Sequence, residues 1–148
     1  MPRIERTAEV VWEGNVARGS GAISAGSGAF SGLGYSLPTR IGQPEGKTSP
    51  EELLAAAHGG CLTMSLAGEL AGAGVPPGKL VCTCRIVMDE IEGQGHQIVG
   101  SYVELVATVE GLDEAVLRAA AAKADDGCPF SALLRRAGAT VVVAARLA

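Results

Sequence analysis

The sequence predicts a single α+β domain, residues 1–148, in which most strands are antiparallel. Three observations support this prediction. Residues 7–13 alternate in polarity, residues 49–73 start with helix-capping residues and continue as a long apolar stretch, and residues 92–95 form a turn signal between two further alternating stretches. A chain of 148 residues is long enough for one hydrophobic core and short for two.

Residues 6–42 are expected to form β-structure. Glycines at 14, 19 and 21 indicate turns after the first alternating stretch, and strand character resumes at residues 22–24. Residues 25–38 are rich in Gly and Ser and are expected to form a loop. Arg40, which follows them, is expected to lie in a loop too.

A long helix is expected over residues 49–73. Ser49 suits the N-cap position, Pro50 suits the first turn, and Glu52 completes a capping box with Ser49. Glycines and prolines after Ala73 end the helix. Its apolar residues cover most of the circumference, which indicates a buried helix, and a second copy of the chain is the simplest way to bury every side.

The remainder is expected to be a hairpin, two helices and a last strand. One face of the first strand carries Cys82, Cys84, Ile86 and Met88, and one face of the return strand carries Val99, Ser101, Val103, Leu105, Ala107 and Val109. A helix follows from Asp113 to Ala124, and residues 125–127 are expected to break it. A short helix over 128–136 and a strand over 141–143 complete the chain.

Composition excludes several classes of function. The net charge is −4 and the basic residues are scattered, which disfavours nucleic acid and anionic membranes as partners. No apolar run reaches the roughly 20 residues of a membrane span. The first residues do not resemble a secretory signal, so the cytoplasm is the expected compartment. In that reducing setting the four cysteines are expected to be packed, catalytic or metal-bound rather than paired in structural disulfides.

The cysteines differ in their surroundings. Cys61 lies on the apolar helix, where most cysteines are inert. Cys128 begins a helix, whose dipole favours a thiolate, although Asp125 and Asp126 oppose it. Cys82 and Cys84 are expected to pack in the core, because same-face neighbours on a strand lie about 7 Å apart, awkward for a disulfide. Their spacing also disfavours zinc, and no metal or other cofactor is expected.

His58 precedes Cys61 by one helical turn, which leaves two interpretations open. The pair could form a Cys-His nucleophile, but a packed, hydrogen-bonded histidine is favoured. Arg40 and Glu51, taken alone, are an ordinary surface charge and an ordinary acid of a first helical turn.

Several segments together resemble the OsmC/Ohr family of hydroperoxide-reducing proteins. The resemblance begins at Val11-Trp12-Glu13-Gly14 and continues through Thr39-Arg40. Its most specific part is Ser49-Pro50-Glu51-Glu52-Leu53-Leu54-Ala55-Ala56-Ala57-His58-Gly59-Gly60-Cys61, and its second signature is Gly127-Cys128-Pro129-Phe130-Ser131. His58 and the place of Arg40 favour the OsmC branch. Gly59-Gly60 stands where alanines are expected, and Asp125-Asp126 makes the second signature more acidic.

The resemblance implies a fold and a set of roles. The fold is an intertwined homodimer with antiparallel sheets around two long central helices. Cys61 would be the peroxidatic thiolate and Cys128 the resolving thiol, while Arg40 and Glu51 would pair beside Cys61, with Glu52 as the alternative acid. The substrate would be an organic hydroperoxide, and an external dithiol, with a lipoyl group as one candidate, would be the reductant.

Three other functions remain open on the sequence. The first is a thiol redox sensor or binding protein that uses the same cysteine pair without efficient turnover. The second is a hydrolase that uses Cys61 and His58. The third is a structural dimer in which no thiol reacts quickly.

Overall fold

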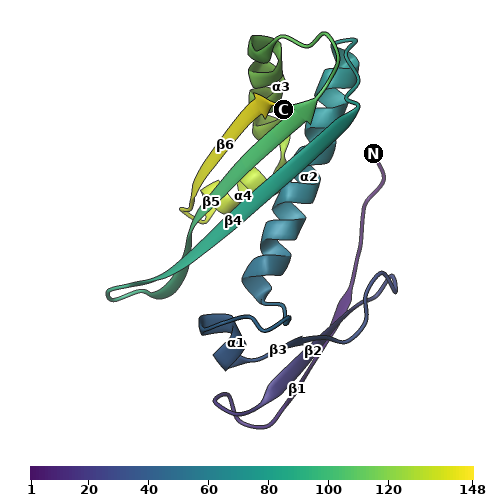
Figure 1. Ribbon diagram of the computed structural model, residues 1–148. Helices are drawn as coiled ribbons and strands as arrows, with labels where there is room; N and C mark the ends of the chain where they lie inside the picture. The colour runs from purple at the N-terminus through teal and green to yellow at the C-terminus, as the bar shows by residue number, and fades with distance from the viewer. The chain divides into compact units, whose positions relative to one another are not determined.

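A computed structural model describes all of residues 1–148 (Figure 1). The chain divides into two compact units, Met1–Pro50 and Glu51–Ala148, which are described in turn. No helix in the structure combines the length and the hydropathy needed to cross a bilayer.

The first unit contains a three-stranded antiparallel sheet in the order β1–β2–β3. Strands β1 (Ala8–Glu13) and β2 (Ser20–Ala25) confirm the predicted strands. Strand β3 (Leu33–Tyr35) lies in the segment that the sequence predicted as a loop, so that prediction was wrong for these residues. The strand forms because β2 offers a ladder, and Gly21 of β2, opposite Tyr35, leaves room for the tyrosine ring.

Arg40 lies in a short helix, α1 (Leu37–Ile41), rather than in the predicted loop. Ser36 is the N-cap: its Oγ accepts a hydrogen bond from the Thr39 N–H at 3.3 Å. Pro38 occupies the first turn, and the Gly42 N–H donates to the Pro38 carbonyl at 2.9 Å. These local bonds stabilise a helix in a stretch whose composition suggested only a loop.

The second unit packs three helices on one face of a three-stranded sheet (Figure 1). Its elements are α2 (Pro50–Gly72), β4 (Lys79–Ile91), β5 (Gly95–Thr108), α3 (Glu114–Gly127), α4 (Pro129–Arg136) and β6 (Thr140–Leu147). Strands β4 and β5 form the predicted antiparallel hairpin, whereas β6 pairs with β5 in parallel. The α2 boundaries confirm the predicted long helix.

The inner face of the hairpin is close to the prediction. Ser101, Val103, Leu105 and Ala107 of β5 are buried, as alternation requires. The register between β4 and β5 shifts between Val87 and Met88, where Val99 is an extra residue on β5. The predicted regular face of the return strand was therefore wrong at Val99, and also at Val109, which lies beyond the end of β5.

Helix α3 continues through residues 125–127, which the sequence predicted as its end. Asp125 forms an ion pair with Arg135 of α4, with 2.5 Å between Oδ2 and Nη2. This contact holds the last turn of α3 in place. Cys128 then ends α3 and is also the N-cap of α4, so no linker separates the two helices.

The core lies between one face of α2 and the sheet. His58, Leu62, Leu66 and Leu70, spaced four residues apart on α2, are all fully buried. The leucines belong to one cluster with residues of β5 and α3 that includes Leu105 and Leu117. On another side of α2, Met64 is 77% exposed. Within one chain, the prediction of a helix buried on every side is therefore correct for one face only.

Close packing of α2 on β4 explains one of the two unexpected glycines. A Cβ atom at Gly59 would lie 3.2 Å from Cys82 Sγ and 3.3 Å from Cys84 Cβ, which is tighter than ordinary van der Waals contact. A Cβ atom at Gly60 would meet nothing within 4 Å, and nothing in the structure explains that glycine.

We predict that Gly59→Ala is less stable than a matched change at Gly68, which is exposed in the same helix with open space around it. Gly68→Ala should raise the free energy of unfolding by about 1 kcal/mol, the usual gain for alanine in a helix. Gly59→Ala should lose that gain, because its methyl group pushes against Cys82. Thermal unfolding at one protein concentration compares the variants, and equal gains at both positions would contradict the close packing.

Candidate active site

Two cysteines that are far apart in the sequence meet in the second unit. Cys61 lies on α2, half-buried against the aliphatic core, and Cys128 is 1% exposed at the start of α4. The Cys128 thiol is close enough to act on the Cys61 thiol and to raise its pKa. Both thiols are free. The structure therefore brings together the two predicted catalytic cysteines from helices α2 and α4.

The immediate neighbours of Cys61 favour its neutral form. Burial raises the pKa of the Cys61 thiol above its ordinary value, and the neighbouring Cys128 thiol raises it further, while the Ser65 side chain lowers it. A reactive thiolate at this position consequently requires a positive charge from another residue.

The acidic residues before Cys128 are compensated in the structure. The hydrogen bond to Asp125 raises the pKa of Arg135, and the charge of Cys128 also acts on that guanidinium. The guanidinium therefore offsets the Asp125 carboxylate, one of the two acids expected to oppose a Cys128 thiolate. Cys128 makes no side-chain hydrogen bond as the α4 N-cap, so its sulfur is available to Cys61.

His58 is the packed histidine that the sequence favoured. Its Nδ1 lies 2.7 Å from Ser101 Oγ on β5, and its Nε2 lies 2.8 Å from Ser131 Oγ on α4. Burial lowers the pKa of His58; Asp125 acts in the opposite direction, and Arg135 adds to the lowering. Two serines occupy both ring nitrogens, which leaves neither for activating Cys61 as a hydrolase would require.

Ser101 and Ser131 were not among the predicted site residues. Both are fully buried on elements that otherwise bury apolar side chains. A polar residue at such a position needs a hydrogen-bond partner, and this was the one signal in the sequence. It could not identify His58 as the partner, because the serines lie 43 and 73 residues away from it.

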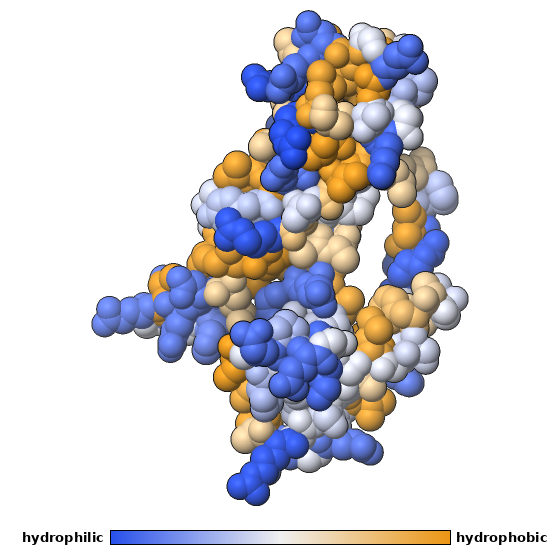
Figure 2. All heavy atoms as spheres, viewed as in Figure 1, coloured by the Kyte–Doolittle hydropathy of each residue, from blue (hydrophilic) through white to orange (hydrophobic).

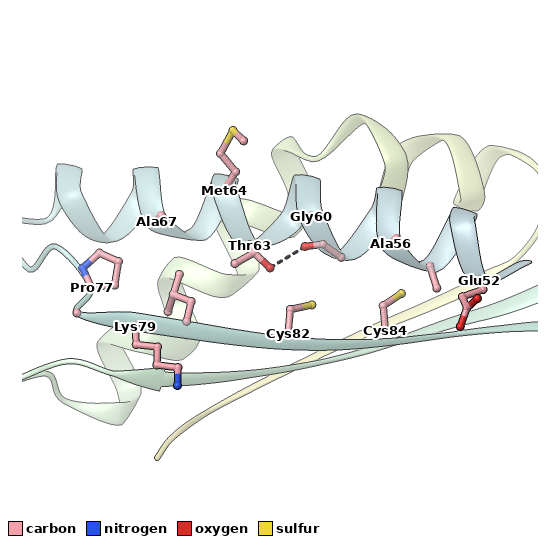
Figure 3. A pocket seen from close by; sticks show the side chains of 14 residues that line it. Glu52, Ala56, Gly60, Thr63, Met64, Ala67, Pro77, Lys79, Cys82 and Cys84 are labelled. Carbon is pink, nitrogen blue, oxygen red and sulfur yellow. Dashed lines mark hydrogen bonds between the residues drawn. The ribbon is translucent and has the colours of Figure 1, made fainter. Parts of the chain in front are cut away.

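Cys82 and Cys84 face a groove between α2 and β4 (Figure 3). The groove encloses about 750 Å³, and both side chains point from β4 toward the helix. Cys84 Sγ lies 3.5 Å from Ser101 Oγ, and burial raises the pKa of Cys82. Both thiols are free and half-buried, in contact with the core but not enclosed by it. Glu52 also lines the groove.

The two predicted charged residues lie on different units. Arg40 is in the last turn of α1, and Glu51 is in the first turn of α2. Their pairing beside Cys61 stays a prediction.

Comparison with known proteins identifies the family. The OsmC-like protein family matches residues 42–144. The chain belongs to this family. A relative named Peroxiredoxin OsmC, from Escherichia coli K12, is 33% identical over 132 residues, which cover 89% of this chain and 91% of the relative. These findings confirm the resemblance inferred from the sequence.

Solved structures confirm the α+β fold class. An organic hydroperoxide resistance protein from Elizabethkingia anophelis aligns over 100% of both chains with a TM-score of 0.76 and 21% identity. An OsmC-like protein from Vibrio cholerae aligns over 97% of this chain and 100% of its own, with a TM-score of 0.78 and 14% identity.

We predict that His58 makes stability depend on pH. Its folded pKa is below the ordinary value of 6.5, so the unfolded chain binds a proton more readily. Stability should be constant above about pH 7.5 and should fall as the pH drops through 6.5 toward the folded pKa, by at most about 1.4 kcal/mol per pH unit.

Urea denaturation between pH 5.5 and 8 measures this slope. His58→Gln should flatten it, while His96→Gln, a matched change at an exposed histidine of β5, should leave it intact. A slope that survives in His58→Gln would show that another group titrates.

Proposed function

We propose that this protein is a thiol-dependent peroxidase that reduces organic hydroperoxides to alcohols. The observation that carries the proposal is the neighbouring pair of free thiols, Cys61 on α2 and Cys128 at the start of α4. Membership of the OsmC-like family and the relative named Peroxiredoxin OsmC support the same chemistry.

The reaction proceeds in three balanced steps. The Cys61 thiolate attacks the distal oxygen of ROOH; the O–O bond breaks, the alkoxide takes a proton to leave as ROH, and Cys61 becomes a sulfenic acid. The Cys128 sulfur then attacks the Cys61 sulfur, and the S–S bond forms as water leaves. An external dithiol reduces the disulfide by exchange and is itself oxidised to a disulfide.

Arg40 is proposed to supply the positive charge that Cys61 lacks among its immediate neighbours, and Glu51 is proposed to pair with Arg40. A guanidinium favours a thiolate and can polarise the peroxide, and a carboxylate can hold the guanidinium in one orientation. Glu52 is the alternative acid. Residues 1–148 would then act as one functional domain, because the proposed roles of Arg40 and Cys61 draw on both compact units.

The surroundings of Cys61 support an organic substrate over hydrogen peroxide. Cys61 packs against a cluster of aliphatic residues that includes Leu62 and Leu66. Such surroundings favour an apolar R group by excluding water from it. A lipoyl-type dithiol is a candidate reductant, and a cytoplasmic setting would keep the reductant available.

We also propose that the protein works as a homodimer. All six residues of β1 are exposed, and they include Val10, Val11 and Trp12. Figure 2 shows apolar atoms among the hydrophilic ones on the visible surface. Val81 of β4 and Val142 of β6 are each 46% exposed. Together with Met64, these residues are apolar surface that a second chain would cover.

We predict distinct outcomes for the two cysteines. Cys61→Ser should abolish peroxide reduction, since no nucleophile remains. Cys128→Ser should allow a single oxidation of Cys61 but no recycling through the disulfide. Consumption of cumene hydroperoxide with dithiothreitol or dihydrolipoamide measures both effects, with hydrogen peroxide at equal concentration as the comparison. Cys82→Ser serves as the control that keeps turnover.

The same assay separates the proposal from its rivals. Full activity in Cys61→Ser would refute the mechanism. Loss of two thiols without turnover would favour a redox sensor, and no loss of thiols would favour a structural dimer.

We predict that Arg40→Ala slows the oxidation of Cys61 about a hundredfold, the range typical of losing one group that stabilises developing charge. The pH at which the rate reaches its plateau should also rise, because the thiolate becomes less stable. Stopped-flow oxidation from pH 5 to 10 measures both quantities. Arg18→Ala removes an exposed arginine of the same unit and should change neither. Unchanged kinetics in Arg40→Ala would remove this residue from the site.

A further inference from the structure

One buried polar cluster connects the helices that carry the two thiols. The His58 ring on α2 hydrogen-bonds with Ser131 of α4 at 2.8 Å and with Ser101 of β5 at 2.7 Å. All three residues are 0% exposed, in a core that is otherwise aliphatic. Buried polar groups persist in such a core when they are paired with one another, as these are.

The cluster lies about one helical turn away from the reacting sulfurs. His58 lies three residues before Cys61 on α2, and Ser131 lies three residues after Cys128. Residues three apart on a helix share a face, about one turn from each other. The His58–Ser131 bond therefore crosses between the two helices about one turn away from the contact of Cys61 with Cys128. The bond to Ser101 instead joins the ring to the sheet, which carries neither of these thiols.

We propose that His58 is a positioning residue, whose bond to Ser131 sets the approach of Cys128 to Cys61 and so controls disulfide closure. The inference rests on the proposed function of this cysteine pair. In closure the Cys128 sulfur displaces the hydroxyl of the Cys61 sulfenic acid, an S–S bond forms, and water leaves. That bond requires a sulfur separation near 2.05 Å and a narrow range of torsion angles. Small displacements of α4 are therefore costly to the rate.

The chemistry of the cluster suits a fixed spacer. An imidazole is rigid, and its two nitrogens point in different directions, toward α4 and toward the sheet. A serine hydroxyl can donate or accept, so both bonds form in either neutral tautomer. Ser101 also contacts Cys84 Sγ at 3.5 Å, and Cys84 Sγ lies 4.0 Å from His58 Nδ1. Asp125 and Arg135, which form an ion pair with each other, are the charged groups that act on the ring.

The test compares the two ends of the cluster. Ser131→Ala removes the bond to α4, and Ser101→Ala removes an equally buried bond to the sheet, so the two should cost similar stability. The reduced full-length protein is mixed with one equivalent of cumene hydroperoxide. Trapping of the sulfenic acid with dimedone times the first oxidation, and mass spectrometry of peptides quantifies the Cys61–Cys128 disulfide.

Ser131→Ala should leave the first oxidation within about twofold and slow closure by at least about tenfold, as expected for a displaced reacting group. Ser101→Ala should close the disulfide at nearly the wild-type rate. Ser131→Thr, which restores a hydroxyl, should recover much of the lost rate. Closure at the wild-type rate in Ser131→Ala would overturn the proposal, and so would equal slowing in both alanine variants.

A second measurement keeps this inference separate from the peroxidase proposal. Glutathione redox buffers set the equilibrium between the Cys61–Cys128 dithiol and its disulfide without any peroxide. Ser131→Ala should shift this equilibrium toward the dithiol by about tenfold relative to Ser101→Ala, by the same positioning argument. If the wild type consumes no peroxide but this shift is present, the positioning role stands and the peroxidase proposal fails. If the shift is absent, the positioning role fails.

Discussion

The arrangement of the second unit depends on burying one face of α2 against the sheet. Leu62, Leu66 and Leu70 are fully enclosed, and full burial of a leucine contributes roughly 2 kcal/mol, so this row is a major source of stability. It also determines which face of α2 is turned toward the sheet. Because His58 and Cys61 belong to the same helix, the burial of the leucines sets the approximate direction of both side chains.

A polar cluster completes what the apolar packing begins. Apolar packing tolerates small rotations and shifts, since many arrangements bury similar areas. The bonds of His58 to Ser101 and Ser131 do not, because a buried polar atom loses its partner when either element moves. In the second unit, apolar packing thus attaches α2 strongly but without a precise direction, and the hydrogen bonds of His58 add a directional attachment close to the thiols. The raised pKa of Cys61 fits this division, since a dry, rigid site holds the sulfur in place but does not ionise it.

The features predicted correctly from the sequence are those with local causes. Helix α2 was predictable because Pro50 and the glycines and prolines after Ala73 set its ends. The features that were missed have causes elsewhere in the chain. Strand β3 depends on pairing with β2, and the last turn of α3 is held by the ion pair of Asp125 with Arg135.

The site divides in the same way. Cys61 and Cys128 were predicted through the resemblance to a family, because the sequence pattern alone favoured an inert Cys61 and left the reactivity of Cys128 open. Ser101 and Ser131 were missed, because their role depends on hydrogen bonds to His58, which is distant in the sequence and is brought close only by the fold. Gly59 was noticed as unusual in a helix, but its cause, the closeness of Cys82, is a distance in space that no spacing in the sequence records.

The junction at Cys128 has a consequence for how this chain can vary in length. One residue serves as the last cap of α3 and the first cap of α4, so no spare residue between the helices can absorb an insertion or a deletion without displacing α4. Such a change would turn the sulfur away from Cys61 and separate Ser131 from His58. The hairpin turn at residues 92–94 has no comparable constraint. Insertions and deletions should therefore be tolerated at that turn and absent from the junction, which makes the junction a fixed point in the length of the chain.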